Sequence, residues 1–523
     1  MSNTFYQQRL HLDHAVVRVI ATVIVLLSAV LTIRAQSSAT DGATPAVLQP
    51  GAPAGSYALS GLDNVNLYNG NLNFRLPLGS VIGRGEAATP IMLPIERKWR
   101  VVDLQFPQSD GSVNHLYMPV SGLWKSLPAL YNPGTIEGRR AAYEVFTCAD
   151  NTPVFTQTLT RLTFTAPDGT EFDLRDTLTN GRPGSTMCNY LNPQSRGTVF
   201  VTADGTAATF ISDQPIYDAS IAPGDAGEFA PSGFLLFRDG MRFRVDAGRV
   251  KWLRDRNGNT ITYDYDANNR VIAITDSLKR VVNITYASGT STYHELSFKG
   301  YSAAPRKIRI NFASMSTVLH SGTVQTYRQL FPELSGGSSV TTFNPTVISS
   351  VTLPNNQEYQ FRYNVYGELA RVVLPTGGAY EYDYTGGAEY ASGTTCCGVD
   401  DSPNIYRRVS ERRVYSDGGT GSSYESKTTY SLFTPTSSTA GYVTVKTYKQ
   451  GDTNPLAQQK HYFHGSPTST FGNLPTDYSA WNEGKEYQTE ALTGDGATVL
   501  KREEPQLSAA CARELVARHA CHQ

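Results

Sequence analysis

Large and polar side chains alternate along several short segments of this chain. Within residues 260–265, Ile261, Tyr263 and Tyr265 occupy every second position, with threonine or aspartate between them. Successive side chains of a β-strand point to opposite faces, so this alternation predicts a strand with one buried face. Residues 270–275 supply the next predicted strand. The segment therefore predicts a β-hairpin.

Turn-forming dipeptides separate the predicted strands. Asn257-Gly258 is the pair preferred by a type I′ hairpin turn, in which both central residues need positive φ. Asn-Gly at 69–70 and Asp-Gly at 168–169 and 239–240 also lie between segments that read as strands. We therefore expect a hairpin at each of these places.

The pattern around the first hairpin recurs after 21 residues. Asp255 is followed at that spacing by Asp276, and Tyr265 by Tyr286; residues 353–384 show the same period. A fixed period of this length is typical of arrays whose units bury their apolar faces against their neighbours. The candidate structural residues of the repeat are Asp255, Asn257, Gly258, Tyr263, Tyr265, Arg270, Asp276, Tyr286, Tyr363 and Tyr384.

These residues resemble the tyrosine-aspartate (YD) repeat of the RHS family. The segments that carry the resemblance are 255–259, 263–266, 270–271 and 275–276. The resemblance implies a large secreted or surface β-protein whose repeats curl into a spiral sheet that encloses a hollow shell. Residues 57–78 and 93–99 also look like the leader that precedes YD repeats in exported bacterial RHS proteins.

The composition agrees with an all-β fold. Tyr 30, Phe 21 and Gly 45, against Met 6 and 17% charged residues, describe aromatic strands joined by glycine turns. We predict an array of antiparallel hairpins that forms a curled or spiral sheet, part of a shell. The net charge of −1 provides no basic field, so we expect no nucleic-acid partner.

The N-terminus reads as an export signal. Two arginines precede the uncharged apolar run 19–33, which is shorter than the roughly 20 residues of a membrane span. We expect a signal peptide over 1–35, cleaved near Ala35, and no transmembrane span after its removal; an uncleaved anchor is the alternative. Residues 36–56, rich in Ser, Ala, Gly and Pro, predict a flexible leader.

The rest of the chain divides into regions that differ in composition and periodicity. Residues 57–250 predict a β-rich region with degenerate hairpins. Residues 251–506 predict the YD-repeat array with insertions. Within one insertion, 307–312 and 324–330 read as strands. The tail 507–523 favours helix by propensity, and it is either a short terminal helix or the sign of a truncated or frame-shifted longer array.

Six cysteines permit disulfides in an exported protein. Cys148 and Cys188 form the preferred pair, because both lie in loop-like sequence. For Cys396 and Cys397 a vicinal disulfide, two separate partners or two free thiols remain open, and their spacing is no zinc signature.

The sequence predicts no catalytic residue, cofactor or metal site. Residues 255–259 carry a trace of a calcium loop, but Asp266 stands where the closing glutamate belongs, and a hairpin turn explains the segment. Acidic residues neighbour tyrosines at 263–266 and 380–384, but strand alternation places the acids and the tyrosines on opposite faces. A glycosidase needs two carboxyl groups that flank one sugar bond. Such a pair would therefore have to come from neighbouring units.

We therefore predict an exported, non-enzymatic RHS/YD-repeat structural protein, part of a β-shell or surface fibre that encloses or displays a polypeptide partner or toxin cargo. A cell-surface carbohydrate-binding adhesin with exposed tyrosine rows is the alternative, and a secreted hydrolase is a third hypothesis. Relatives that release a toxin carry an Asp-Pro-x-Gly-Leu motif for self-cleavage. No Asp-Pro dipeptide occurs here, so no protease and no cargo can be assigned.

Overall fold

The structure of the protein is a computed structural model. It describes residues 56–58, 61–68, 70–95, 97, 99–107, 113–121, 131–147, 153–179, 195–202, 207–217, 219–220, 228–332, 340–385, 407–421, 423–433, 442–463 and 486–504. The predicted signal peptide, nearly all of the leader, the tail 507–523 and all six cysteines lie outside these residues. The described strands all belong to one compact unit, which spans Pro50–Gln523.

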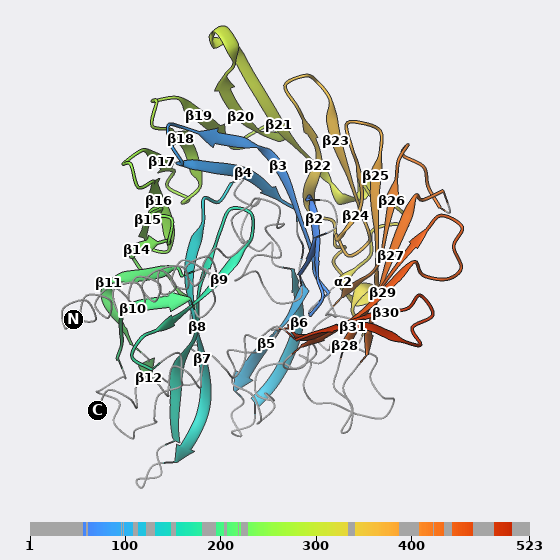
Figure 1. The fold of residues 1–523 in the computed structure, drawn as a ribbon, viewed down its shortest axis with the longest axis horizontal. Helices are drawn as coiled ribbons and strands as arrows, with labels where there is room; N and C mark the ends of the chain where they lie inside the picture. Colours follow the sequence, from blue (N-terminus) through green and yellow to red (C-terminus); the bar gives the residue numbers. More distant parts are fainter. Residues whose placement is uncertain are drawn as a thin grey trace, which may run out of the picture. The chain divides into compact units, whose positions relative to one another are not determined.

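The described residues form β-strands almost throughout, which confirms the all-β prediction (Figure 1). The first four strands make one antiparallel sheet: β1 (Ser56–Ala58), β2 (Asp63–Asn66), β3 (Leu72–Ile82) and β4 (Ala88–Pro94). A separate two-stranded sheet follows, made of β5 (Trp99–Pro107) and β6 (Val113–Ser121). None of the described helices is long and apolar enough to cross a membrane.

The third and largest sheet begins with ten strands. They are β7 (Thr135–Thr147), β8 (Pro153–Thr165), β9 (Glu171–Asp176), β10 (Ser195–Thr202), β11 (Thr209–Tyr217), β12 (Ala219–Ser220), β13 (Glu228–Phe229), β14 (Gly233–Leu236), β15 (Arg242–Asp246) and β16 (Arg249–Arg254). The hairpins expected around 168–169 and 239–240 are confirmed as β8–β9 and β14–β15. The one expected at 69–70 is β2–β3.

Eight of these strands close a ring through their pairings: β7, β8, β9, β10, β11, β14, β15 and β16. The ring is sealed where Ile136 donates to the carbonyl of Gly248 (2.8 Å) and Val250 donates to that of Gly134 (3.3 Å). Phenylalanine side chains of its strands pack together, with Phe164 5.7 Å from Phe243 between ring centres. A closed ring leaves no open sheet edge.

From β16 the sheet continues as an antiparallel meander in which each strand pairs with the one before it. Its strands are β17 (Thr260–Tyr265), β18 (Val271–Thr275), β19 (Val281–Thr285), β20 (Tyr293–Lys299), β21 (Pro305–Ser314), β22 (Thr346–Thr352), β23 (Glu358–Tyr363), β24 (Leu369–Val373), β25 (Ala379–Thr385), β26 (Arg408–Tyr415), β27 (Ser426–Phe433), β28 (Tyr442–Lys449), β29 (Ala457–Phe463), β30 (Glu486–Leu492) and β31 (Val499–Glu503). The strands follow one another along a curved path (Figure 1).

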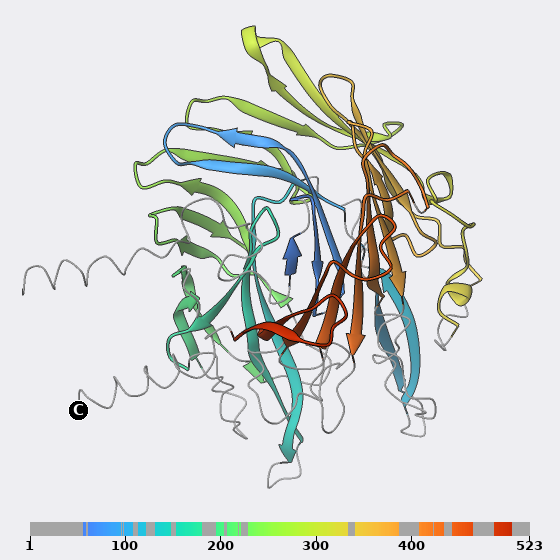
Figure 2. The ribbon, with the colours of Figure 1, turned by 45° about the vertical axis from the view of Figure 1, so that its right-hand side comes forward.

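The N-terminal sheet covers one face of this meander (Figure 2). Phe74 of β3 is fully buried and meets Phe361 of β23 at 6.1 Å between ring centres. Trp99 packs on Phe331 and Phe343 at 4.7 and 4.9 Å. The apolar positions of the alternating strands are therefore buried against the chain's own N-terminal strands, which supplies the hydrophobic driving force for the fold.

One predicted strand is wrong. Residues 324–330 contain the short helix α2 (Tyr327–Leu330) in place of a strand. Thr326 caps it: its hydroxyl accepts from the Gln329 N–H, and the Gln329 side chain accepts from the Thr326 N–H. This reciprocal capping box is a helix-start signal that outweighs the apolar alternation. Two 3₁₀ turns, η4 (Tyr301–Ala303) and η5 (Met315–Thr317), complete the described helical segments.

Candidate functional site

The repeat tyrosines lock neighbouring hairpins together. The Tyr286 hydroxyl donates to the backbone carbonyl of Val271 at 2.9 Å, and Val271 is itself the strand partner of Tyr265. Tyr265 makes the equivalent bond to the carbonyl of Val250 at 2.5 Å. The 21-residue units thus lie side by side, and each tyrosine ties its strand to the preceding one.

The second repeat region uses the same contact. The Tyr363 hydroxyl donates to the Ile348 carbonyl (2.7 Å), and that of Tyr384 donates to the Leu369 carbonyl (2.9 Å). In both regions the strand register shifts just before the first tyrosine, between Asp264 and Tyr265 and between Arg362 and Tyr363. Such a bulge re-aims the side chain that follows it.

These tyrosines are not exposed. Tyr263, Tyr286 and Tyr363 are 3%, 9% and 4% exposed, while Tyr265 and Tyr384 are half-buried against the core. Burial raises the pKa of Tyr265 and Tyr363, so their hydroxyls remain protonated donors. The repeat tyrosines are therefore used for packing and do not form the exposed rows that the adhesin alternative requires.

Aspartates build the turns between the repeat strands. Asp255 Oδ1 accepts from the N–H groups of Asn257 (2.9 Å) and Asn259 (2.8 Å). Asp276 Oδ1 does the same for Leu278 (2.8 Å) and Arg280 (2.9 Å). An aspartate that satisfies backbone donors within its own turn fixes the turn without help from elsewhere.

The type I′ turn predicted at Asn257-Gly258 is wrong. Gly258 has φ +87°, but Asn257 does not have positive φ. Gly258 N–H donates to the Asp255 carbonyl (3.1 Å) and Asp255 N–H to the Asn259 carbonyl (3.0 Å). This is a type I turn followed by one left-handed residue. The Asp255 carboxylate favours it, because it holds the two N–H groups that flank the glycine.

The Asp255 carboxylate also reaches the N-terminal sheet. Its Oδ2 accepts from the Glu86 N–H (3.0 Å) and from Asn259 Nδ2 (2.8 Å). Burial alone would raise the pKa of Asp255, but the hydrogen bonds from Asn259, Glu86 and Asn257 outweigh it and lower the pKa. Both oxygens are occupied by protein donors, which argues against calcium at this turn.

Arg270 supports the next tyrosine. Its guanidinium lies 4.1 Å from the centre of the Tyr286 ring, a cation–π contact. The same side chain pairs with Asp266 at 2.7 Å. Arg270 is therefore placed by the turn before it and packs on the tyrosine after it.

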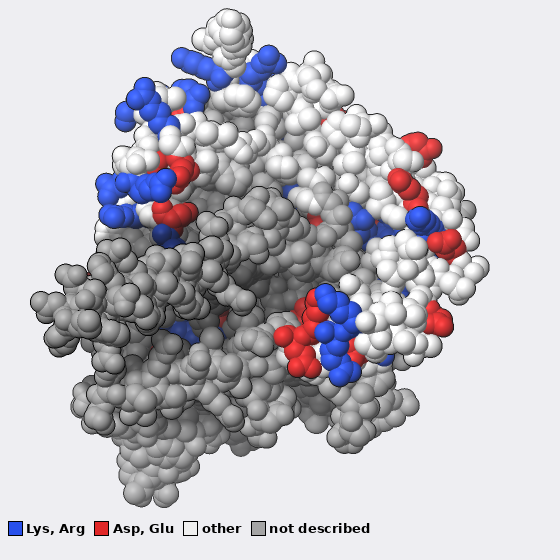
Figure 3. Space-filling model, viewed as in Figure 1, with Lys and Arg blue, Asp and Glu red and all other residues white. Residues whose placement is uncertain are grey.

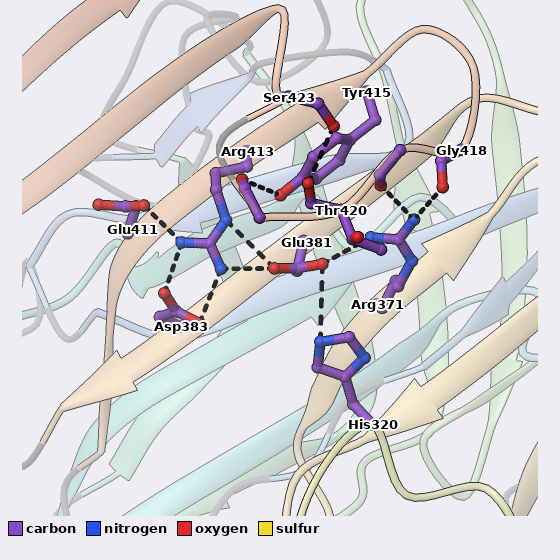
Figure 4. Close-up of polar contacts among 12 residues, drawn as sticks. His320, Arg371, Glu381, Asp383, Glu411, Arg413, Tyr415, Gly418, Thr420 and Ser423 are labelled. Atoms are coloured by element: carbon purple, nitrogen blue, oxygen red, sulfur yellow. Dashed lines mark hydrogen bonds and ion pairs between the residues drawn. The ribbon is translucent and has the colours of Figure 1, made fainter.

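A buried ionic cluster lies farther along the meander, on β24–β26 (Figure 4). The register sets Glu381 of β25 opposite Arg371 on one side and Arg413 on the other. Glu381 Oε2 is 2.5 Å from Arg371 Nη1, and Oε1 is 2.6 Å from Arg413 Nη2. The Glu381 side chain is 7% exposed, so this carboxylate is neutralised by two guanidiniums in a shielded position.

Further polar groups saturate the cluster. Arg413 also pairs with Asp383 (2.6 Å) and Glu411, and His320 Nε2 lies 3.6 Å from Glu381. Burial would lower the pKa of Arg413, but its hydrogen bonds to three carboxylates raise it. Each of the three carboxylates, those of Glu381, Asp383 and Glu411, is therefore held by the Arg413 guanidinium.

Arg371 joins the cluster to the turn after β26. Its Nη2 donates to the carbonyls of Gly418 (2.8 Å) and Gly419 (2.7 Å). The guanidinium also lies 5.0 Å from the centre of the Tyr415 ring. The cluster therefore holds three strands and one turn in place, and we assign it a structural role.

The family comparison agrees with these contacts. Residues 246–281, which include the turn aspartates and Tyr265, match the family described as RHS Repeat. The chain carries an RHS repeat. The matched segment ends before Tyr286. Tyr286, and Tyr363 and Tyr384 of the second repeat region, make the same hydroxyl-to-carbonyl contact outside it.

No curated protein matches the chain. Among solved structures, the crystal structure of TcdB2-TccC3 aligns at 11% identity and TM-score 0.22, covering 83% of this chain and 26% of that one. TcdB2-TccC3-TEV gives 10% and 0.21, covering 84% and 25%. A Photorhabdus luminescens Tc holotoxin pore gives 8% and 0.18, covering 86% and 25%. This chain thus spans about a quarter of their length.

The RHS-repeat pattern did not reveal the contacts between distant segments. Asp63 of β2 pairs with Arg412 of β26 at 2.5 Å, and the Tyr382 hydroxyl donates to Asp63 at 2.8 Å. Arg408 donates to the carbonyls of Leu67 and Tyr68 in the β2–β3 turn, both at 2.8 Å. No local signal could have found them, because the partners are more than 300 residues apart.

Proposed function

We propose that this chain is an exported, non-enzymatic RHS-repeat structural protein, part of a β-shell or surface fibre that encloses or displays a polypeptide partner. The tyrosine contact carries the proposal: the same hydroxyl-to-carbonyl bond, 15 residues back, recurs at Tyr265, Tyr286, Tyr363 and Tyr384. A contact that repeats with the sequence period stabilises a long row of neighbouring strands. A catalytic site would instead need one local arrangement of side chains.

The state of the carboxylates supports a non-enzymatic role. Glu381, Asp383 and Glu411 all accept from Arg413. Asp255 and Asp276 are committed to their turns. A hydrolase that uses two carboxyl groups needs one as a proton donor and the other as a base or nucleophile, both open to the substrate. The carboxylates named here are held by protein donors instead.

A protease-protection assay tests enclosure. The full chain is co-expressed with the polypeptide encoded directly downstream, purified as a complex and treated with proteinase K. We expect the polypeptide to survive until the chain is unfolded. Digestion at the same rate with and without the chain would contradict enclosure, while a stable complex that is digested would mean display.

Export is tested by N-terminal sequencing of the protein recovered outside the cytoplasm. We expect the mature chain to begin near Gln36. Recovery only in the cytoplasm with Met1 intact would contradict export, and an intact N-terminus in the membrane fraction would select the anchor alternative.

A further inference from the structure

Every second turn of the meander lies along one rim of the sheet. Each strand from β14 to β25 pairs antiparallel with the one before it, so alternate turns lie at the same end of the strands. Neighbouring strands are about 4.8 Å apart, which spaces these turns about 10 Å apart. The turns of this rim are 237–241, 255–259, 276–280, 300–304, 353–357 and 374–378.

One rim turn carries a residue that its backbone disfavours. All six turns have the same two backbone hydrogen bonds, which join the first residue to the fourth and to the fifth, and the fourth residue has positive φ. Lys279 occupies this place with φ +63°, a conformation that glycine and asparagine adopt more readily than lysine does. The other five turns have Gly240, Gly258, Ala303, Asn356 and Gly377 there. A residue that its own turn disfavours points to a role outside the fold.

Exposed cations gather at the first four turns of the rim. Arg256 and Arg280 are partly neutralised, because they pair with Glu86 and Asp276. The others form no ion pair within the described residues, and they are Arg238, Lys279, Lys299 and Arg306. These four positive charges are open to a partner. Figure 3 shows Lys and Arg side chains at the left and top of the view, with acidic side chains beside those at the left.

Few acids oppose these cations. Asp255 and Asp276 are 2% and 3% exposed and accept hydrogen bonds within their own turns. Asp239 is exposed, and its carboxylate accepts from the N–H of Met241. The next two turns of the rim, 353–357 and 374–378, have no charged residue. The basic stretch is therefore limited to the first four turns, a length of about 30 Å.

Apolar side chains stand among the cations. Tyr301 is 92% exposed in the turn of the β20–β21 hairpin, which projects at the top of the view in Figure 1. Leu278, in the turn before it, is 43% exposed, and Ile82 at the end of β3 is 57% exposed. The Arg280 guanidinium donates to the Ile82 carbonyl, so the tip of the β3–β4 hairpin lies against the β18–β19 turn. The rim therefore presents apolar side chains and free cations together.

We propose that these four turns dock on the surface of a bilayer that contains anionic phospholipid. The free cations face the headgroups, and Tyr301 enters the interface, where tyrosine is enriched. Anionic lipid attracts each Lys or Arg near its surface, and the interface also buries apolar side chains. A soluble polyanion would pair with the cations but leave Tyr301, Leu278 and Ile82 in water. The inference does not depend on the proposed enclosure of a partner, so the two tests can fail separately.

Vesicle co-sedimentation of the full chain tests the proposal. The probes are vesicles of phosphatidylcholine alone and of phosphatidylcholine mixed equally with phosphatidylglycerol. We expect a partition coefficient about a hundredfold or more higher on the mixed vesicles, because each of four free cations contributes about fivefold. That ratio should fall as salt is raised. The apolar run 19–33 contributes to both coefficients and cancels in their ratio. A ratio near one, or a ratio insensitive to salt, would overturn the proposal.

Two charge variants locate the docking surface. The double variant Lys279→Asn/Lys299→Gln should lower the ratio about 20-fold, because two of the four free cations are lost. Lys449→Gln/Lys501→Gln is the matched control, since it removes the same charge from exposed lysines of β28 and β31 and should stay near the parent. Equal reductions in both double variants, or no reduction in the first, would overturn the assignment to this rim.

The apolar side chains distinguish a bilayer from an acidic polypeptide. Leu278→Ser/Tyr301→Ser keeps every charge and should lower partition onto the mixed vesicles about tenfold or more, because less apolar surface is buried. Binding of soluble poly-glutamate needs only the cations. Tight binding of poly-glutamate by this variant, with vesicle partition unchanged from the parent, would replace the bilayer with an acidic protein partner.

A thermal melt separates docking from folding. Asparagine adopts the left-handed backbone more readily than lysine does, and Lys299 is exposed, so Lys279→Asn/Lys299→Gln should melt no lower than the parent. Weaker docking by an equally stable protein is the result that a surface role predicts. A lower melting temperature would show that these lysines stabilise the fold, and would contradict the role assigned to them.

Discussion

The carbonyl of Val271 accepts a hydrogen bond from the hydroxyl of Tyr286, 15 residues later in the chain. Val271 also pairs across the ladder with Tyr265, which stands 21 residues before Tyr286. One residue therefore joins two successive tyrosines of the RHS repeat. This contact explains why the period of the sequence is also the period of the packing.

Tyr286→Phe should weaken the fold without altering its packing. The variant keeps the ring and loses the bond to the Val271 carbonyl, so we expect unfolding to become easier by about 1 kcal/mol. Denaturant unfolding followed by circular dichroism measures this. Tyr301→Phe is the control, because Tyr301 is 92% exposed and should be neutral. Equal effects at the two positions would contradict the assigned role of the hydroxyl.

Gly258→Ala should be costly, and Asn257→Ala should not. Gly258 has φ +87° with open space where a Cβ would lie, so the penalty is conformational, about 1–2 kcal/mol. Asn257 has ordinary φ and contributes its backbone N–H, which alanine retains. Comparing the free energy of unfolding of the two variants with that of the parent distinguishes the type I turn seen here from a type I′ turn. A large loss at Asn257 would indicate the type I′ turn instead.

Asp255 should make stability depend on pH. Its pKa is lowered in the fold from an ordinary value of 3.8, so its stabilising contribution is present above about pH 4 and is lost as pH falls through the lowered folded pKa. Asp255→Asn should therefore be less stable than the parent at pH 7, and the difference should shrink toward pH 3. Thermal melts across this range measure it. A difference that grows on acidification would contradict the sign.

Glu381→Gln should damage the ionic cluster. The variant leaves Arg371 and Arg413 without their shared carboxylate in a shielded position, which costs about 3 kcal/mol. Asp383→Asn is the control, because the Asp383 side chain is 52% exposed and its loss should cost under about 1 kcal/mol. Hydrogen exchange should show the loss first in β24–β26. Similar losses in the two variants would mean that burial of Glu381 is unimportant.

The alternation at 260–265 and the 21-residue period determined the strands, the hairpins and the residues of the repeat. This was possible because side-chain alternation and aspartate-glycine turns are local properties of a few adjacent residues. The turn type at Gly258 and the helix α2 were predicted wrongly. Hydrogen bonds that backbone N–H groups donate to the Asp255 carboxylate outweighed the dipeptide preference, and the Thr326 capping box outweighed the alternation.

Only the tertiary structure decided which segments meet. The ring closed between β7 and β16, the Asp63–Arg412 pair and the Glu381 cluster join residues whose separation carries no periodic signal. The same holds for Arg242 and Arg254, which become cross-strand partners only through the register of β15 and β16. Sequence determines what a strand can bury on each face, but the partner against which it is buried depends on the packing of the whole chain.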